Sequence, residues 1–212
     1  RRNCRIENSR LVTRMKRYLP FVIVLGVALA AFGSGTMLYR AKRPQVKNIP
    51  ESEIVEAKGN AAPHVRGNPN ASVTLEEFGD FQCPPCGQFA LFVEELLKEY
   101  DSRLRIVFHN FPLPLHEHAR EAAIAAEAAG LQGKFWEMYD KLYREQSEWS
   151  KASNTRELFE SYAATLGLDM DQFKKDMDGE KAVQRVDADH ALGESLGVKV
   201  TPTLFLNKRP IE

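Results

Sequence analysis

The hydrophobic residues of this chain fall into three successive patterns. Residues 18–39 contain no charged side chain, and their apolar run over residues 21–32 is typical of a segment that spans a membrane or directs export. Residues 40–66 are polar and interrupted by proline and glycine, which indicates a linker. From residue 67 onward, apolar positions recur at the spacings of strands and helices, which predicts one folded domain over residues 67–212.

This folded part is predicted to be an α/β domain. Residues 73–78 and 104–108 predict strands, and the apolar positions after residue 83 recur at helical spacing as far as residue 100. A strand, a helix and a strand at this spacing predict a right-handed βαβ unit with parallel strands. An all-helical insert follows, and then a strand and the start of a hairpin. The predicted elements are the insert over about residues 115–196, its helices over residues 119–129, 134–144, 155–166, 171–177 and 182–196, the strand over residues 203–206 and its hairpin partner from residue 211.

The charge distribution gives an orientation to the apolar segment. The chain has 29 basic and 29 acidic residues, and residues 1–38 hold seven of the basic residues and one of the acidic ones. This excess of positive charge predicts residues 1–17 in the cytoplasm and the folded domain on the extracytoplasmic or periplasmic side. An uncleaved transmembrane anchor is the favoured interpretation, and a signal peptide cut near Ala28-Leu29-Ala30 is the alternative. The mildly acidic remainder argues against nucleic acid as a partner.

The beginning of the coding region is also suggested by this pattern. Met15-Lys16-Arg17 leads directly into the apolar run, as in the start of an export signal, so residues 1–14 with Cys4 are expected not to be translated. The exported protein would then hold two cysteines, Cys83 and Cys86. That number suits a working dithiol better than a disulfide framework.

The chemistry of the domain centres on Cys83-Pro84-Pro85-Cys86, which stands where a strand turns into a helix. The two prolines suit the first helical turn, where a missing N–H costs no hydrogen bond. Cys83 then occupies the helix cap, facing the positive end of the helix dipole, so we expect it to be the acidic, exposed nucleophile and Cys86 to be the resolving thiol. A disulfide that closes so small a loop stabilises a fold little, so its value is chemical.

A zinc site is the alternative chemistry for a CxxC motif. It requires two further ligands, and the third cysteine, Cys4, lies across the apolar segment from the pair. His109, His116 and His118 offer no second half of such a site. We therefore expect no metal and no cofactor other than a redox-active disulfide, while a peptide-binding or metal-binding module without redox turnover stays open as the alternative function.

Two stretches together indicate a family. Residues 77–86, ending in the CxxC motif, together with Val200-Thr201-Pro202-Thr203, resemble the thioredoxin superfamily. The helical insert between the second strand and Thr201-Pro202 resembles the DsbA-like branch of thiol:disulfide oxidoreductases, as do the stretches 110–113 and 133–136. The resemblance implies a thioredoxin-like fold for about residues 64–212.

The resemblance also implies a role for individual residues. Cys83 would be the attacking thiolate and Cys86 the resolving thiol, while Pro202 would be a cis-proline beside the disulfide that leaves room for a substrate peptide. Thr201 would offer its backbone to that peptide. Glu77 would be a buried acid that assists proton transfer to the inner thiol, although an ordinary strand carboxylate is the alternative interpretation.

Other residues near the motif receive lesser roles. Pro84 and Pro85, which separate the cysteines, are expected to contact the substrate, and His116 and His118 are expected to serve the start of the alanine-rich helix rather than catalysis.

The sequence departs from the DsbA-like pattern in two respects. Members of the family continue with another strand and a closing helix, which residues 1–212 do not contain, so we expect these elements to be missing from the sequence. The strongly oxidising DsbA enzymes carry Pro-His between their cysteines, where this chain has Pro84-Pro85. Because Pro85 supplies neither an imidazole nor an amide to the Cys83 sulfur, we expect a less stabilised thiolate and a less oxidising couple.

The function predicted from the sequence is therefore disulfide exchange with unfolded or folding exported proteins, by an enzyme tethered to the membrane. A membrane redox partner is expected, a monomer is the favoured oligomeric state, and the direction of electron flow is left open.

Overall fold

The structure is a computed structural model, and it describes residues 64–211. Its strands form one five-stranded sheet in the order β1-β3-β2-β4-β5, in which β2 and β3 are parallel and the other neighbours are antiparallel. The strands are β1 (His64–Gly67), β2 (Val73–Gly79), β3 (Leu104–Asn110), β4 (Thr203–Leu206) and β5 (Arg209–Pro210).

The predicted βαβ unit is confirmed. Strand β2 is followed by helix α3 (Pro84–Tyr100) and a single 3₁₀ turn (Asp101–Arg103), and the chain returns in β3 parallel to β2. Both strands are buried along most of their length, as expected for central strands of a sheet with both faces covered.

The last strands also follow the prediction, with one shift. Strand β4 covers the predicted residues 203–206, and its hairpin turn uses Asn207 and Lys208, which both have positive φ. The partner strand β5 pairs Arg209 with Leu206 and Pro210 with Phe205, so the hairpin returns two residues earlier than the predicted residue 211. Proline is tolerated in β5 because this strand lies at the edge of the sheet.

The insert between β3 and β4 is helical, as predicted, but it contains one helix more than the sequence pattern indicates. The additional helix, α6, has only four residues, too few for a periodic pattern to show. The helices are α4 (Ala119–Leu131), α5 (Phe135–Arg144), α6 (Gln146–Trp149), α7 (Thr155–Thr165), α8 (Met170–Met177) and α9 (Glu180–Ser195).

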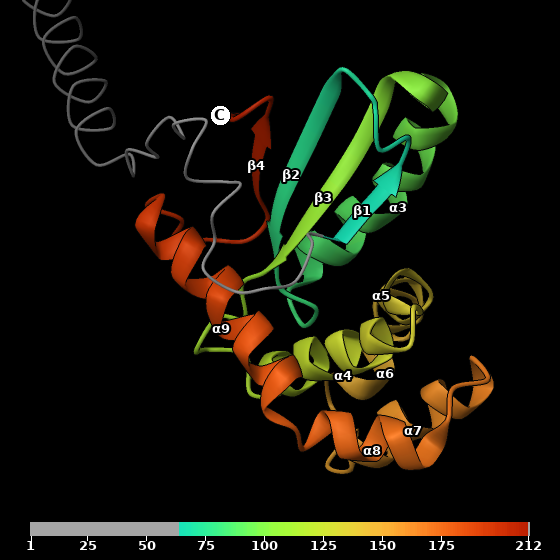
Figure 1. Ribbon diagram of the computed structural model, residues 1–212. Helices are drawn as coiled ribbons and strands as arrows, with labels where there is room; N and C mark the ends of the chain where they lie inside the picture. Colours follow the sequence, from blue (N-terminus) through green and yellow to red (C-terminus); the bar gives the residue numbers. More distant parts are fainter. Residues whose placement is uncertain (1–63, 212) are drawn as a thin grey trace, which may run out of the picture. The chain divides into compact units, whose positions relative to one another are not determined.

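The two faces of the sheet are covered by different helices (Figure 1). Leu75 and Ile106 pack with Val93 of α3 on one face, whereas Phe78 and Phe205 pack with α9 on the other. The insert helices α4 to α8 gather at one end of the sheet, and α9 runs back from them towards β4. Because the side chains of a strand alternate between faces, Glu76 and Glu77 of β2 point to opposite faces of the sheet.

Several sequence predictions fall outside the described residues, namely the tail over residues 1–17, the apolar segment over residues 18–39 and most of the linker. Within residues 64–211, no helix is long and apolar enough to cross a membrane. Strand β1 begins at His64 and pairs with β3, so the last three residues assigned to the predicted linker belong to the sheet.

Candidate active site

Helix α3 begins where the sequence predicts, directly after Cys83. Cys83 is the N-cap residue, with extended backbone angles of φ −74° and ψ 118°. Its amide donates to the carbonyl of Asp80 at 3.1 Å, and its own carbonyl accepts from the amide of Gly87 at 3.2 Å. Pro84 and Pro85 occupy the first turn and are exposed. The Cys83 sulfur therefore stands at the end of α3 where the helix dipole favours negative charge.

The prediction that Cys83 is exposed was wrong, because only 5% of the residue is accessible. Its Sγ lies 3.3 Å from the carbonyl oxygen of Thr201, to which the thiol donates. From the insert, Gln146 Nε2 donates to the carbonyls of Phe81 at 2.6 Å and Cys83 at 2.9 Å. Two segments more than 60 residues away in the chain therefore cover the helix start, and no local pattern reveals them.

Cys86 lies one turn further along α3 and is fully buried. Both cysteines are free thiols in this structure. Burial raises the pKa of the Cys86 thiol far above its usual value, and the neighbouring carboxyl of Glu77 raises it further. A thiolate at Cys86 therefore requires a group nearby that removes its proton.

Glu77 is a candidate for that group, because it is fully buried on β2. Burial raises the pKa of its carboxyl to about 8, and a hydrogen bond from Tyr139 partly opposes the increase. The Tyr139 hydroxyl donates to Glu77 Oε2 at 3.4 Å. Carboxylates are rarely buried without a cation, so the environment of Glu77 is unusual for a strand carboxylate.

Thr201 and Pro202 lie beside the cysteines. The peptide bond between them is cis, and β4 begins directly after Pro202 and pairs with β2, where Thr203 lies opposite Phe78. Through this pairing and the contact of Cys83 with the Thr201 carbonyl, the predicted residues of the two distant motifs come together.

The sequence analysis assigned no role to Asp80, which anchors the loop before the cysteines. Asp80 is buried and its carboxylate accepts three hydrogen bonds. The donors are the amide of Gln82 at 2.7 Å, the amide of Leu113 at 2.8 Å and Nδ1 of His116 at 2.7 Å. The sequence signal that could have indicated this role was the position of an acidic residue between an apolar strand and a CxxC motif.

A buried charged cluster on the opposite face of β2 was also missed. The ring of His109 lies between Glu76, whose Oε2 is 3.6 Å from Nε2, and Asp189 of α9, whose Oδ1 is 3.2 Å from Nδ1. Burial alone would lower the pKa of His109, but the hydrogen bond to Asp189 and the negative charges of Asp189 and Glu76 outweigh it and raise the pKa to about 9. The signal for Asp189 was its spacing of three residues from the buried Val186 and Leu192.

His116 and His118 differ in what they contact. His118 precedes α4 as its N-cap residue but makes no side-chain cap hydrogen bond, and its amide donates to Gln82 Oε1 at 2.7 Å. The side chain of His116 binds Asp80, while its carbonyl accepts from the amide of Ala119, the first residue of α4, at 3.3 Å. Of the two, it is therefore His116 whose side chain supports the loop that carries Cys83.

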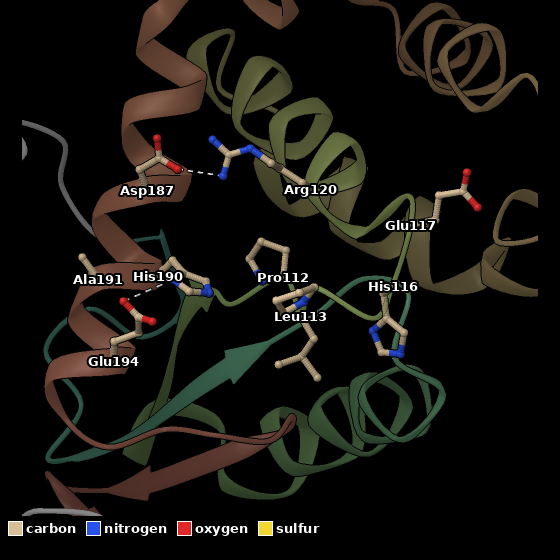
Figure 2. Close-up of a pocket in the computed structure, with 10 residues that line it drawn as sticks. Pro112, Leu113, His116, Glu117, Arg120, Asp187, His190, Ala191 and Glu194 are labelled. Atoms are coloured by element: carbon tan, nitrogen blue, oxygen red, sulfur yellow. Dashed lines mark ion pairs between the residues drawn. The ribbon is translucent and has the colours of Figure 1, made fainter.

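His116 also lines a pocket of about 470 Å³ between the loop after β3 and helix α9 (Figure 2). Arg120 and Asp187 form an ion pair of 2.7 Å in its wall, and His190 lies 3.9 Å from Glu194. The Arg120 guanidinium of this wall is therefore engaged by a neighbouring carboxylate. Among residues 64–211, no group of three or more His, Cys, Asp or Glu side chains is placed to hold a metal ion.

Comparison with known proteins identifies the family. A family model described as "Thioredoxin" matches residues 59–212. A curated relative, the Na⁺/H⁺ antiporter NhaA 1 of Mycolicibacterium gilvum, is 39% identical over 193 residues, which are 87% of this chain and 30% of the relative. NhaA 3 of Salinispora tropica is 42% identical over 69% of this chain and 22% of its own length. The chain thus spans less than a third of the length of each of these two relatives.

Solved structures show the same fold. A thioredoxin-like oxidoreductase from Silicibacter pomeroyi is 29% identical with a TM-score of 0.60, over 70% of this chain and 82% of its own. BdbD from Bacillus subtilis is 26% identical with a TM-score of 0.63, over 71% and 84%. The thiol-disulfide exchange protein α-DsbA2 from Wolbachia pipientis, at 22% identity, shares the fold with a TM-score of 0.63 over 76% and 86%. The chain therefore belongs to the thioredoxin family, and its structural neighbours are DsbA-like thiol-disulfide oxidoreductases.

Proposed function

We propose that this protein is a thiol:disulfide oxidoreductase that exchanges disulfides with exported proteins through Cys83 and Cys86. One observation carries the proposal: a cysteine at the positive end of α3 contacts the carbonyl of Thr201 beside cis-Pro202, and a second cysteine lies fully buried one turn behind it. The helix dipole supports the nucleophile, and the burial of Cys86 keeps the second thiol for an internal reaction.

In the reducing direction, the Cys83 thiolate attacks one sulfur of a substrate disulfide. The substrate S–S bond breaks, a mixed disulfide with Cys83 forms, and the other substrate sulfur leaves as a thiolate that takes a proton from solvent. Cys86 then attacks Cys83 Sγ, which releases the second substrate sulfur and forms the Cys83–Cys86 disulfide. Two electrons pass to the substrate, and the oxidising direction is the reverse of these steps.

Glu77 serves the second step. The buried thiol of Cys86 must lose its proton before it attacks, and the carboxylate of Glu77 accepts it. Because the pKa of Glu77 is about 8, its carboxylate is a stronger base towards the Cys86 thiol than an exposed glutamate would be.

The substrate peptide binds beside the cis-proline. Thr201 offers backbone groups to an extended peptide, and Pro202 has no N–H that would compete for them. Pro84 and Pro85 are exposed at the start of α3, and Val200, with 61% of its surface exposed, adds an apolar contact on the other side of Thr201. Such a surface suits unfolded chains, because it recognises backbone and apolar side chains rather than one sequence.

We also propose that the domain works on the extracytoplasmic side, held to the membrane by residues 18–39 and served by a membrane redox partner. The charge pattern before the apolar segment supports this orientation. Fractionation of cells into membrane and soluble material, with protease added from outside, tests it.

Trapping of the mixed disulfide tests the exchange reaction. In the Cys86→Ser variant the second step cannot occur, so substrate proteins should remain linked to Cys83 and be released by a reductant. The Cys83→Ser variant is the matched control and should trap none. If Cys83→Ser abolishes exchange but leaves peptide binding intact, the enzyme is supported. If Cys86→Ser traps no substrate protein and both variants bind peptide as the wild type does, the protein is better described as a binding module.

The direction of exchange follows from the reduction potential of the pair, measured in glutathione buffers. A value of about −120 to −180 mV indicates a disulfide donor, and a value of about −270 mV indicates a reductant. Because Pro85 offers no donor to the Cys83 sulfur, we expect a potential more negative than the oxidising end of this range.

A further inference from the structure

Helix α5 of the insert places two phenols beside the redox pair. Tyr139 and Tyr143 are one turn apart on α5, and both are buried. Their rings lie 4.8 Å apart and both contact the ring of Phe81, which stands two residues before Cys83. The insert thus contributes these two phenols, besides Gln146, to the surroundings of the cysteines.

The two phenols differ in what their hydroxyls contact. The Tyr139 hydroxyl donates to Glu77 Oε2 at 3.4 Å, whereas the Tyr143 hydroxyl has no hydrogen-bond partner among the described residues. The other oxygen of the carboxyl, Glu77 Oε1, also has no partner there. One oxygen of Glu77 is therefore held by the insert, and the other remains available for a proton.

The position of Tyr139 is set by close ring packing. Its ring lies 5.1 Å from that of Phe108 on β3 and 5.0 Å from that of Trp136 on α5. Together with the contacts to Phe81 and Tyr143, these leave the hydroxyl little freedom to turn away from Glu77.

The surroundings of Glu77 contain few other titratable groups. In the sheet, Glu77 lies opposite Phe108 on β3 and Leu204 on β4, which are both apolar. The charge of Glu77 in turn raises the pKa values of the Cys86 thiol on α3 and of the phenols of Tyr139 and Tyr143 on α5, so these three groups face the carboxyl. Tyr139 is thus the neighbour whose hydrogen bond stabilises the charged carboxylate.

We propose that Tyr139 is a positioning residue for Glu77, holding the carboxyl by Oε2 so that Oε1 exchanges a proton with the Cys86 thiol. This inference rests on the proposed function and deepens it: the helical insert, besides enclosing the site, sets the protonation of the acid that serves the second step of exchange.

The test removes one hydroxyl at a time from the full-length protein. Tyr139→Phe deletes the bond to Glu77, and Tyr143→Phe is the matched control, since it removes the same atom from the same helix without touching that bond. The titration of Glu77 is followed by the infrared band of the protonated carboxyl, assigned by its loss in Glu77→Gln. In Tyr139→Phe the midpoint should rise by about one pH unit, the lower end for a hydrogen bond to a charged group because the bond is long.

A kinetic measurement follows the same proton. The reduced protein is mixed with an aromatic disulfide, and release of the second aromatic thiol reports the attack of Cys86 on the mixed disulfide. The pH midpoint of this rate should move upwards in Tyr139→Phe and stay unchanged in Tyr143→Phe. An equal change in both variants, or none in Tyr139→Phe, overturns the inference.

The two proposals fail in different ways. If the infrared midpoint of Tyr139→Phe moves but the protein exchanges disulfides with no protein substrate, the positioning role stands and the proposed function fails. If exchange with protein substrates is observed and neither midpoint moves in Tyr139→Phe, the positioning role alone fails.

Discussion

Replacement of Glu77 by Gln should make the folded domain less sensitive to alkaline pH. Burial raises the pKa of this carboxyl from 4.5 to about 8, so the folded protein binds the proton more tightly than the unfolded chain does. Below about pH 4.5 the carboxyl is protonated in both states and does not change the free energy of unfolding. As pH rises towards 8, unfolding releases the proton, so the free energy of unfolding falls, and this loss is complete above about pH 8.

The magnitude follows from the size of the pKa shift. A difference of 3.5 units between 4.5 and about 8, at about 1.4 kcal/mol per unit, corresponds to about 5 kcal/mol at alkaline pH. Between about pH 5 and pH 9 the wild-type protein should lose about 4 kcal/mol that Glu77→Gln does not lose. This is a large part of the stability of a typical domain.

The assay is denaturant unfolding of the reduced wild-type and variant proteins at both pH values. The difference between the two pH values removes any constant cost of burying the glutamine amide, and the titration of other groups cancels between wild type and variant. Glu95→Gln on the exposed side of α3 is the control and should follow the wild type. Parallel pH profiles of wild type and Glu77→Gln would refute the reasoning.

Two further replacements test the buried polar groups around the site. His109→Asn should lower the free energy of unfolding at neutral pH by about 3 to 5 kcal/mol, because it leaves Glu76 buried without its cation and leaves Asp189 with Arg185, 3.4 Å away, in place of two cations. The same replacement should make the free energy of unfolding fall less at alkaline pH. A pKa raised from 6.5 to about 9 contributes about 3 kcal/mol of stability that is present below pH 6.5 and lost as pH passes 9. A pH profile of stability that is unchanged between these values contradicts this. Asp80→Ala should cost about 2 to 4 kcal/mol, measured by the same unfolding, because two partly buried amides and the His116 ring lose their acceptor. A loss below about 0.5 kcal/mol would show that water replaces it.

The agreement between sequence and structure is best where local periodicity decides the outcome. The strand and helix on either side of Cys83 follow from alternating and helical spacing, and the start of α3 follows from Pro84 and Pro85. Prediction was weaker at short elements. Helix α6 and strand β1 have four residues each, and their formation depends on packing against the rest of the domain rather than on a repeated pattern.

The sequence by itself determined the class of fold, the order of the elements and the identity of the two cysteines, because these depend on neighbours within a few residues. Only the tertiary structure decided which face of β2 receives Glu76 and which receives Glu77, that Thr201 covers Cys83, and that Tyr139 reaches the buried acid. The contacts of Cys83 with Thr201 and of Glu77 with Tyr139 join residues more than 60 positions apart. Their energies depend on burial and distance, and both arise only when β4 pairs with β2 and the helical insert packs against the sheet.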